Sequence, residues 1–322
     1  MSADRDIGVV VIGRNEGKRL VQCIASLVGR ADPLVYVDSG STDGSVEHAR
    51  AAGVEVVSLD MSQPFTAARA RNTGYARVRD LAPEGQYVQF IDGDCALDPG
   101  WFDTARAALD GTPELAVVCG RRRERHPEAS LWNRMIDAEW DSPVGEAKAC
   151  GGDALMRRAA LDAVQGYRED LIAGEEPEMC FRMRALGWRI RRLDAEMTLH
   201  DAAMTRVSQW WQRSRRAGHT YAEGAALHGN SPERYRRREL ARTLIWGLAL
   251  PLAALLGGLL ISPWAFALLL LYPLQVVRLA ARGTDPARAL FTVLGKFPEL
   301  QGVLGYWAGR LSGKRRRLIE YK

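Results

Sequence analysis

Residues 243–277 form a run of 35 residues without a charged side chain, TLIWGLALPLAALLGGLLISPWAFALLLLYPLQVV. One membrane-spanning helix needs about 20 apolar residues, so the run is too long for one span and short for two. The sequence ISP at residues 261–263 interrupts it near the middle. We therefore expect a hairpin of two short helices that either spans a membrane or re-enters it. The alternative is a buried helical hairpin in a soluble protein.

Arginines flank this run on both sides. Those before it are Arg234, Arg236, Arg237, Arg238 and Arg242, and those after it are Arg278, Arg282 and Arg288. Basic residues concentrate on the cytoplasmic side of a membrane, and a hairpin places both flanks on one side. The N-terminus, MSADRDIG, has no apolar signal segment. We therefore expect attachment to the cytoplasmic membrane, with the first domain facing the cytoplasm.

The two ends of the chain differ in charge. Residues 1–200 have 25 Lys and Arg against 32 Asp and Glu, whereas residues 201–322 have 19 against 7. A basic segment indicates an anionic surface as partner, and the hydrophobic run favours a membrane over nucleic acid. We expect no nucleic-acid partner.

Residues 290–311 show an apolar stripe at steps of three and four residues, typical of a helix. Its members are Leu290, Val293, Leu294, Phe297, Leu300, Leu304, Trp307 and Leu311. The sequence KRRR follows at residues 314–317. The pattern predicts an interfacial helix with a basic clamp on lipid headgroups. The alternative is a helix packed on the first domain.

Strand and helix signals alternate in the first 200 residues. Apolar strands are predicted at residues 7–13, 33–38, 54–59 and 87–91, and helices at residues 16–29, before Gly53 and at residues 69–78. This alternation predicts βαβ units and a mostly parallel sheet. The sequence VIGRNEG after the first strand lacks the dinucleotide fingerprint, which argues against a nicotinamide enzyme. Five cysteines without CxxC spacing indicate a reducing compartment and neither a disulfide framework nor a zinc site.

Carboxylates follow two of these strands. Asp38 ends the second strand, and Asp92 and Asp94 follow the fourth in FIDGDCALD. Ligands bind at the carboxyl ends of strands in open parallel sheets. The carboxylates therefore predict a site for a diphosphate bound through a hard cation, Mg²⁺ or Mn²⁺. The alternative for each is ordinary turn or capping chemistry.

Five segments occur in order: VVVIGRNEG, VDSGSTDGS, FIDGDCALD, ACGGDALMRR and GEEPEMCFRMRALGWRI with a later LH. Together they resemble the family 2 glycosyltransferases of GT-A fold, over roughly residues 5–205. The resemblance implies transfer of a sugar from a nucleotide-sugar, usually with inversion, and a divalent metal, Mg²⁺ or Mn²⁺.

The resemblance also implies roles for individual residues. The donor-binding residues would be Asn15, Glu16, Asp38, Arg71, Asp92 and Gly93. The metal ligands would be Asp92, Asp94 and His200. Glu176 would be the catalytic base, and its neighbour Glu175 would tune it or position a ligand. The alternative for this pair is the acidic first turn of a helix that ends at Gly187.

Two departures from the family pattern leave questions open. Ser39 stands where many members have a second aspartate, so the base of the donor, in UDP-, GDP- or dTDP-sugar, is not determined. Glu175 and Glu176 replace the usual Glu-Asp pair, which changes the reach of the base by one methylene.

A third group of residues is expected on the acceptor side. These residues are Gly152, Asp153, Gln209, Trp210, Trp211 and Arg213. The first two form either an acceptor-side loop or a plain turn. The others lie in QWWQR, which resembles the membrane-associated QxxRW motif in composition and not in spacing; tryptophan packing in the core is the alternative. The arginines at 121, 122, 123 and 125 either hold phosphate or form a solvated face.

We thus predict an α/β catalytic domain of GT-A fold at residues 1–205, interfacial or juxtamembrane helices at 206–242, the hydrophobic hairpin at 243–277 and an amphipathic, basic segment at 278–322. The predicted function is inverting sugar transfer to a lipid or lipid-linked acceptor in the synthesis of envelope polysaccharide or glycolipid. One alternative is a subunit of a polysaccharide-forming synthase, but the hydrophobic run is too short for a transmembrane polysaccharide channel. The other is a non-catalytic membrane scaffold, and the presence of Asp38, Asp92, Asp94 and Glu176 argues against it.

Overall fold

The computed structural model describes residues 6–313, which fall into two compact units, Met1–Thr205 and Arg206–Lys322. The boundary between the units coincides with the end of the expected catalytic domain. The sequence KRRR, for which a basic clamp is predicted, lies outside the described residues.

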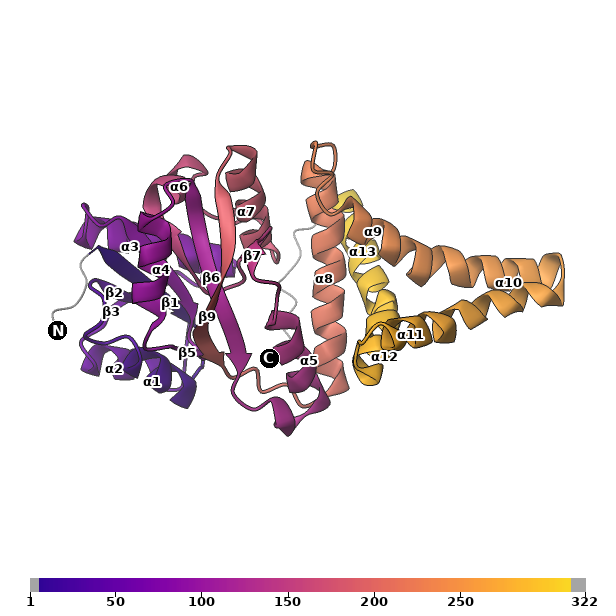
Figure 1. The fold of residues 1–322 in the computed structure, drawn as a ribbon, viewed down its shortest axis with the longest axis horizontal. Helices are drawn as coiled ribbons and strands as arrows, with labels where there is room; N and C mark the ends of the chain where they lie inside the picture. The colour runs from indigo at the N-terminus through magenta and orange to yellow at the C-terminus, as the bar shows by residue number, and fades with distance from the viewer. Residues whose placement is uncertain (1–5, 314–322) are drawn as a thin grey trace. The chain divides into compact units, whose positions relative to one another are not determined.

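The first unit is built around one nine-stranded sheet (Figure 1). In pairing order its strands are β3 (Glu55–Ser58), β2 (Leu34–Asp38), β1 (Ile7–Gly13), β4 (Tyr87–Asp92), β8 (Ala154–Arg157), β6 (Leu115–Glu124), β9 (Arg189–His200) and β5 (Cys95–Leu97), with β7 (Gly145–Glu146) paired to β9. Strands β3, β2, β1 and β4 are parallel, as predicted. The remaining strands form a mixed half, in which only β6 and β9 are parallel.

Helices flank the sheet. They are α1 (Lys18–Ala25), α2 (Ser45–Ala51), α3 (Ala67–Leu81), α4 (Trp101–Asp110), α5 (Leu131–Trp140), α6 (Arg158–Ala163) and α7 (Glu175–Ala185), with a 3₁₀ turn η1 (Pro127–Ala129). The side chain of Thr66 caps α3 by accepting a hydrogen bond from the Arg69 amide. A Cβ on Gly74 would lie 2.4 Å from Val10, so glycine allows α3 to lie directly on β1. With both faces covered, the central strands are continuous apolar runs, which is why the sequence predicted them.

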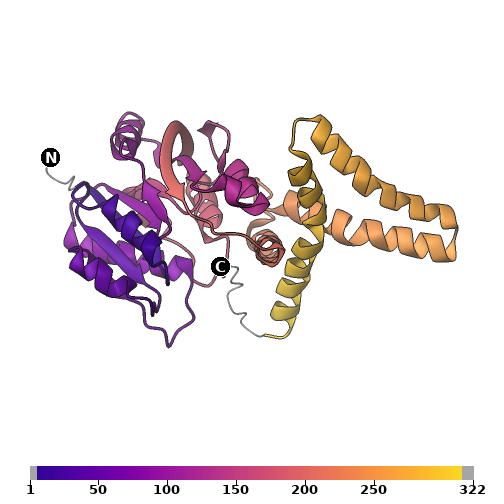
Figure 2. The same cartoon turned by 90° about the horizontal axis from the view of Figure 1, so that it is seen from below.

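The second unit is entirely helical in its described part. Its helices are α8 (Val207–His228), α9 (Arg237–Leu244), a π turn η2 (Ile245–Ala249), α10 (Leu250–Leu260), a 3₁₀ helix η3 (Pro263–Leu270), α11 (Leu271–Ala281), α12 (Pro286–Leu294) and α13 (Lys296–Leu311). Segments α9 to α10 form one continuous helix and η3 to α11 a second. The two run back along each other as a hairpin that turns at residues 261–262, where ISP predicted the break (Figure 2).

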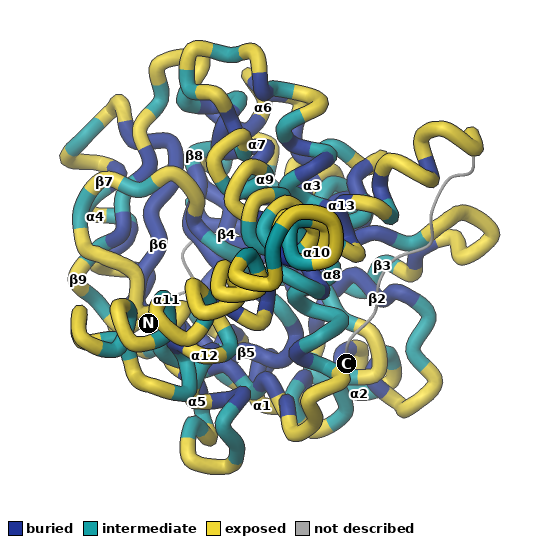
Figure 3. Tube along the Cα trace, turned by 90° about the vertical axis from the view of Figure 1, so that its right-hand side faces the viewer, coloured by how far each residue is buried: buried dark blue, intermediate teal, exposed yellow. Residues whose placement is uncertain are grey.

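The hairpin exposes its apolar side chains. Each arm is long and apolar enough to cross a membrane. Only 17% of the apolar stretch of the first arm is buried, however, and 0% of that of the second. Figure 3 shows α10 end-on and largely exposed. Trp264, at the tip, is 87% exposed. The soluble-core alternative predicts burial, and the described part of the chain provides no cover for these side chains.

Helices α8 and α13 cross at glycines. A Cβ on Gly218 would lie 1.9 Å from the Glu299 carbonyl oxygen, and one on Gly302 would lie 2.0 Å from the Arg215 carbonyl oxygen. The two backbones therefore touch. The packed face of α13 contains glycines, Val303 and Tyr306, whereas Leu304, Trp307 and Leu311 of the predicted stripe are exposed. The stripe is divided between α12 and α13, and only part of it faces outward, because Val293 is buried and Phe297 and Leu300 are half-buried.

Candidate active site

Asp94 and His200 meet because of strand register. Asp92 is the last residue of β4, and only Gly93 and Asp94 separate it from β5. Strand β5 pairs antiparallel with β9, with Cys95 opposite His200, so Asp94 lies beside the histidine. The distance from His200 Nε2 to Asp94 Oδ2 is 3.5 Å, and both side chains are buried. The structure brings these two predicted metal ligands together.

Glu124 fixes the orientation of the His200 ring. Its Oε2 lies 2.8 Å from His200 Nδ1, and its Oε1 accepts a hydrogen bond from the Ala202 amide. Burial, followed by the positive charge of Arg122, lowers the pKa of His200 even though Glu124 opposes this shift. A neutral ring that donates from Nδ1 to Glu124 leaves the Nε2 lone pair facing Asp94. A carboxylate beside an imidazole lone pair suits a divalent cation such as Mn²⁺, so these residues fit the metal that the resemblance implies.

Asp92 is held between two arginines. Its Oδ1 lies 2.9 Å from Arg71 Nη2, and its Oδ2 lies 3.3 Å from Arg122 Nη1. Arg71 also pairs with Glu175 at 2.8 Å. Burial alone would lower the pKa of Arg71, but Asp92 and Glu175 together raise it. The Asp92 side chain remains 27% exposed, which makes it the accessible member of the acidic pair.

Asp153 lies beneath the site. It is fully buried, accepting hydrogen bonds from the Asp92 amide and the Thr198 hydroxyl. This arrangement favours the turn alternative for Asp153, because its carboxylate supports the backbone of Asp92. Gly152 lies against the donor-side carboxylate, because a Cβ there would be 2.6 Å from Asp92 Oδ2 and 3.2 Å from Arg122 Nη1.

Glu175 and Glu176 begin α7 and have different partners. Glu175 is paired with Arg71. Glu176 Oε1 instead accepts hydrogen bonds from the Cys150 amide at 2.6 Å and from the thiols of Cys150 and Cys180 at 3.1 and 3.0 Å. Among the described residues no cation pairs with Glu176, so this carboxylate is buried without a positive partner.

The predicted nucleoside-pocket residues lie in the loops after β1 and β2. Asn15 has a φ of 55° and joins the two loops: its amide donates to the Ser41 hydroxyl, and its side-chain oxygen accepts from the Thr42 amide. Glu16 pairs with Arg19 at 2.8 Å.

Asp38 and Gly93 complete this side of the site. The carboxylate of Asp38 is buried and accepts hydrogen bonds from the Tyr36 hydroxyl and from the amides of Gly40 and Ser41. This arrangement favours the turn alternative for Asp38. The Gly93 amide donates to a carbonyl of β1, and a Cβ at Gly93 would be 3.3 Å from Glu16.

The remaining predicted acceptor-side residues lie on α8, in the second unit: Gln209, Trp210, Trp211 and Arg213. The Trp210 ring is buried and packs on Phe291, with ring centroids 5.0 Å apart. This contact favours the core-packing alternative for Trp210. Trp211 Nε1 donates to Gln301, and Gln209 accepts a hydrogen bond from the backbone at the start of α8.

Several residues of the site have a weak local sequence signal or none. Arg122 and Glu124 come from β6, whose run of arginines indicated at most a phosphate contact. Cys150 and Cys180 are 30 residues apart without motif spacing. The arginine run was the one available signal for Arg122; none pointed to Glu124 or to the thiols.

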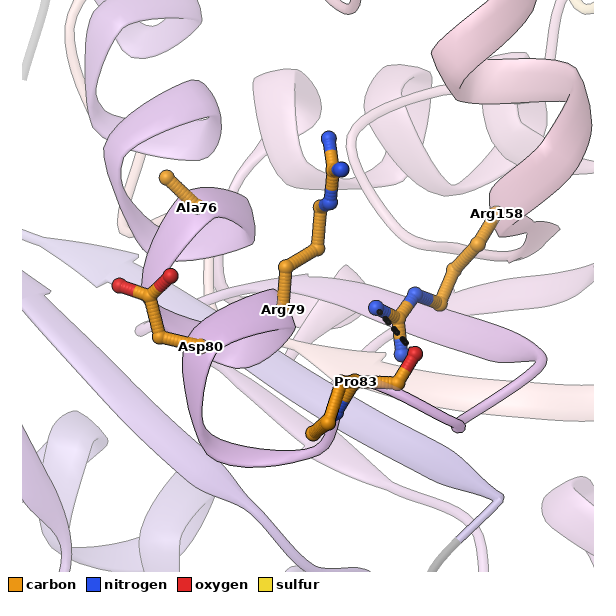
Figure 4. Close-up of a pocket in the computed structure, with 5 residues that line it drawn as sticks. All are labelled: Ala76, Arg79, Asp80, Pro83 and Arg158. Carbon is orange, nitrogen blue, oxygen red and sulfur yellow. Dashed lines mark hydrogen bonds between the residues drawn. The ribbon is translucent and has the colours of Figure 1, made fainter.

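A surface pocket of about 310 Å³ lies elsewhere on the first unit (Figure 4). It is lined by Ala76, Arg79, Asp80, Pro83 and Arg158. The Arg158 guanidinium in it donates to main-chain carbonyls, including that of Pro83. The pocket lies by the amino end of β4, where the Arg158 amide donates to the Gln86 carbonyl, and that end is about 17 Å along the strand from Asp92 at a rise of about 3.3 Å per residue. It is therefore separate from the acidic site.

Comparisons with known proteins agree with this geometry. A family model described as glycosyl transferase family group 2 matches residues 87–281, more than half of the chain, and one described as glycosyl transferase family 2 matches residues 8–164. The chain therefore belongs to the family 2 glycosyl transferases.

Individual relatives are distant. The succinoglycan biosynthesis protein ExoA of Rhizobium meliloti is 24% identical over 325 residues, covering 96% of each chain. The pre-mycofactocin glycosyltransferase of Mycobacterium tuberculosis is 26% identical over 70% of this chain, and the match spans 48% of that protein. Among solved structures, the chain is similar to the mannosyltransferase PcManGT from Pyrobaculum calidifontis in complex with GDP-Man and Mn²⁺. The TM-score is 0.58 at 18% sequence identity, and the match covers 95% of this chain and 89% of that one. This likeness confirms the GT-A fold.

Proposed function

We propose that this glycosyltransferase transfers a sugar, with inversion, to a lipid or lipid-linked acceptor at the cytoplasmic face of a membrane, using a divalent metal. The observation that most supports this proposal is the meeting of Asp94 and His200 at 3.5 Å, with Asp92 held by Arg71 and Arg122 and Glu176 buried at the start of α7 without a described cation partner. Each group has a distinct task in the transfer.

Asp94 and His200 would hold the metal, with Asp92 beside them. A divalent cation supplies Lewis-acid stabilisation of the negative charge that develops on a leaving diphosphate. PcManGT, which shares the fold, was crystallised with Mn²⁺ and GDP-Man, which supports a metal-bound donor here. Arg71 and Arg122 place two further positive charges next to Asp92, where the phosphates of the donor would lie.

Glu176 would accept the proton of the acceptor hydroxyl. Inverting transfer needs one base and no covalent intermediate. All hydrogen bonds described for Glu176 go to Oε1, which leaves Oε2 to take the proton. Glu175 is less suited, because its carboxylate is already engaged in an ion pair with Arg71.

The second unit supports a membrane-bound acceptor. The arms of the hairpin expose leucines, and arginines flank both arms at the base of the hairpin, which would place that base on the cytoplasmic side. ExoA, similar over nearly the whole chain, is named for succinoglycan biosynthesis. We therefore place this protein in envelope polysaccharide or glycolipid synthesis.

The proposal is tested with full-length protein in detergent and a panel of UDP-, GDP- and dTDP-sugars. Release of the nucleoside diphosphate and binding of each donor are measured with Mn²⁺, Mg²⁺ or a chelator. We expect one nucleotide class to bind and react only with metal, and Asp94→Ala to lose this dependence while remaining folded. Equal donor affinity with and without chelator would rule out the metal role. Transfer to water-soluble acceptors alone, with none to lipid extracts, would rule out the lipid acceptor.

A further inference from the structure

Two thiols and a carboxylate meet behind the start of α7. Cys150 Sγ and Cys180 Sγ are 3.7 Å apart, and Glu176 Oε1 lies 3.1 and 3.0 Å from them. All three side chains are buried, and both cysteines are free. The three ligand atoms lie within 4.8 Å of one another. This thiol–carboxylate cluster, Cys150, Cys180 and Glu176, is separate from the group formed by Asp94 and His200.

Glu176 differs from the other carboxylates of the site in the kind of partner it has. Its acidic neighbours each have an arginine: Asp92 and Asp153 pair with Arg122, and Glu175 pairs with Arg71. Glu176 has an amide and two thiols, and none of the described residues gives it a cation. Buried carboxylates are normally paired with a cation or coordinate a metal.

The spacing of the sulfurs fits a tetrahedral soft-metal site. Two Zn–S bonds of about 2.3 Å at the tetrahedral angle place their sulfurs about 3.8 Å apart, close to the 3.7 Å observed. A carboxylate oxygen at about 2.0 Å from the same ion would lie about 3.5 Å from each sulfur, so Glu176 needs to withdraw by about 0.5 Å. Thiolates select Zn²⁺ and its heavier analogues over Mg²⁺ or Mn²⁺.

We propose that Cys150, Cys180 and Glu176 form a second metal site, selective for Zn²⁺ or Cd²⁺, whose occupation blocks transfer. Both thiols are protonated before binding, because burial raises the pKa of Cys150 and raises that of Cys180 to about 11. Binding then forms two metal–sulfur bonds and one metal–oxygen bond and releases two protons. No electron is transferred. The inhibition rests on the proposed function, because it requires Glu176 to be the base; the binding itself does not.

The binding test uses full-length protein in detergent with Cd²⁺ as the probe. The thiolate-to-cadmium absorption band is recorded in the Asp94→Ala background, which removes the other candidate ligand group. We expect one thiolate-bound ion per chain. Loss of a residue that only supports a metal ligand weakens metal binding by about 10–100-fold. The double variant Cys150→Ser/Cys180→Ser removes two ligands, so we expect it to weaken Cd²⁺ binding by more than about 100-fold.

Cys23→Ser is the matched control, since Cys23 is a buried free cysteine outside the cluster. It should retain full binding. If the double variant does not fold, each single serine variant should show a weaker band than the parent. An absent band in the parent, or an equal band in the cluster variants, overturns the site.

The inhibition test uses protein with intact Asp94 and saturating Mn²⁺. Added Zn²⁺ should abolish transfer, a stronger chelator should restore it, and Cys150→Ser/Cys180→Ser should resist. If Cd²⁺ bound at the cluster but Zn²⁺ did not inhibit transfer, the metal site would stand and the assignment of Glu176 as the base would be wrong. Inhibition that is equal in parent and double variant would overturn the inhibitory role of the site.

Discussion

At the scale of single residues, Glu175 and Glu176 are adjacent in sequence and chemically different. We expect Glu176→Gln, which keeps size and hydrogen bonding, to lower turnover by about 10²–10⁴-fold with donor affinity nearly unchanged. Glu175→Gln loses the ion pair with Arg71 and should change donor affinity more than turnover. Steady-state kinetics and donor titration of both variants decide the assignment. If Glu175→Gln were inactive and Glu176→Gln kept most of its turnover, the catalytic base would be Glu175.

Glu124 acts through His200. Glu124→Gln keeps the shape of the side chain but weakens the hold on Nδ1, so we expect Mn²⁺ affinity to fall by about 10–100-fold. The measurement is Mn²⁺ binding without donor, followed by titration or electron paramagnetic resonance. Glu128→Gln, at an exposed position on η1, is the control and should bind Mn²⁺ like the parent. Unchanged affinity in Glu124→Gln would show that His200 needs no such partner.

Some residues of the site could be predicted and others could not, for a physical reason. Asp92 and Asp94 end an apolar strand, so local sequence indicates a ligand edge. Glu124 meets His200 only because β6 and β9 are neighbours, a pairing between residues 76 positions apart. The same holds for Cys150 and Cys180. Long-range strand and helix pairing leaves no periodic signal in the sequence.

At the scale of elements, the parallel half of the sheet was predictable and the mixed half was not. Strands β1, β2 and β4 are buried on both faces and therefore read as short apolar runs. Strand β9 has the sequence RIRRLDAEMTLH, and β6 ends in four charged residues. These strands turn charged side chains toward the site and the surface, which removes the alternation by which strands are recognised.

The crossing of α8 and α13 gives a prediction about stability. Gly302→Ala places a Cβ against the backbone of α8, and overpacking of this kind costs typically about 1–3 kcal/mol. We expect a lower unfolding temperature of the second unit in detergent. Leu304→Ala, on the exposed face of the same helix, should leave that temperature nearly unchanged. Equal stability of Gly302→Ala and the parent would mean that the helices do not cross this closely.

At the scale of the whole molecule, each unit has its own packing. The first has a large apolar core, and α8 packs with α9 and α13 in the second. We expect truncation after Thr205 to release a folded, nucleotide-binding protein into the soluble fraction, because it removes the exposed hairpin and no part of the sheet. Fractionation and donor binding of the truncated chain test this. A full-length chain that is soluble without detergent would contradict the membrane proposal.

The 3₁₀ helix in the second arm has a consequence for bilayer thickness. The uncharged part of the first arm has 18 residues and that of the second 15, residues 243–260 and 263–277. At about 1.5 Å per α-helical and about 2.0 Å per 3₁₀ residue, the two arms are both about 27 Å long. The stretched segment thus compensates for three missing residues. Arms of this length that span a membrane match a bilayer whose hydrocarbon core is slightly thinner than the usual value of about 30 Å. Sugar transfer by the protein in lipid vesicles should therefore decline as the acyl chains of the vesicle lipids become longer.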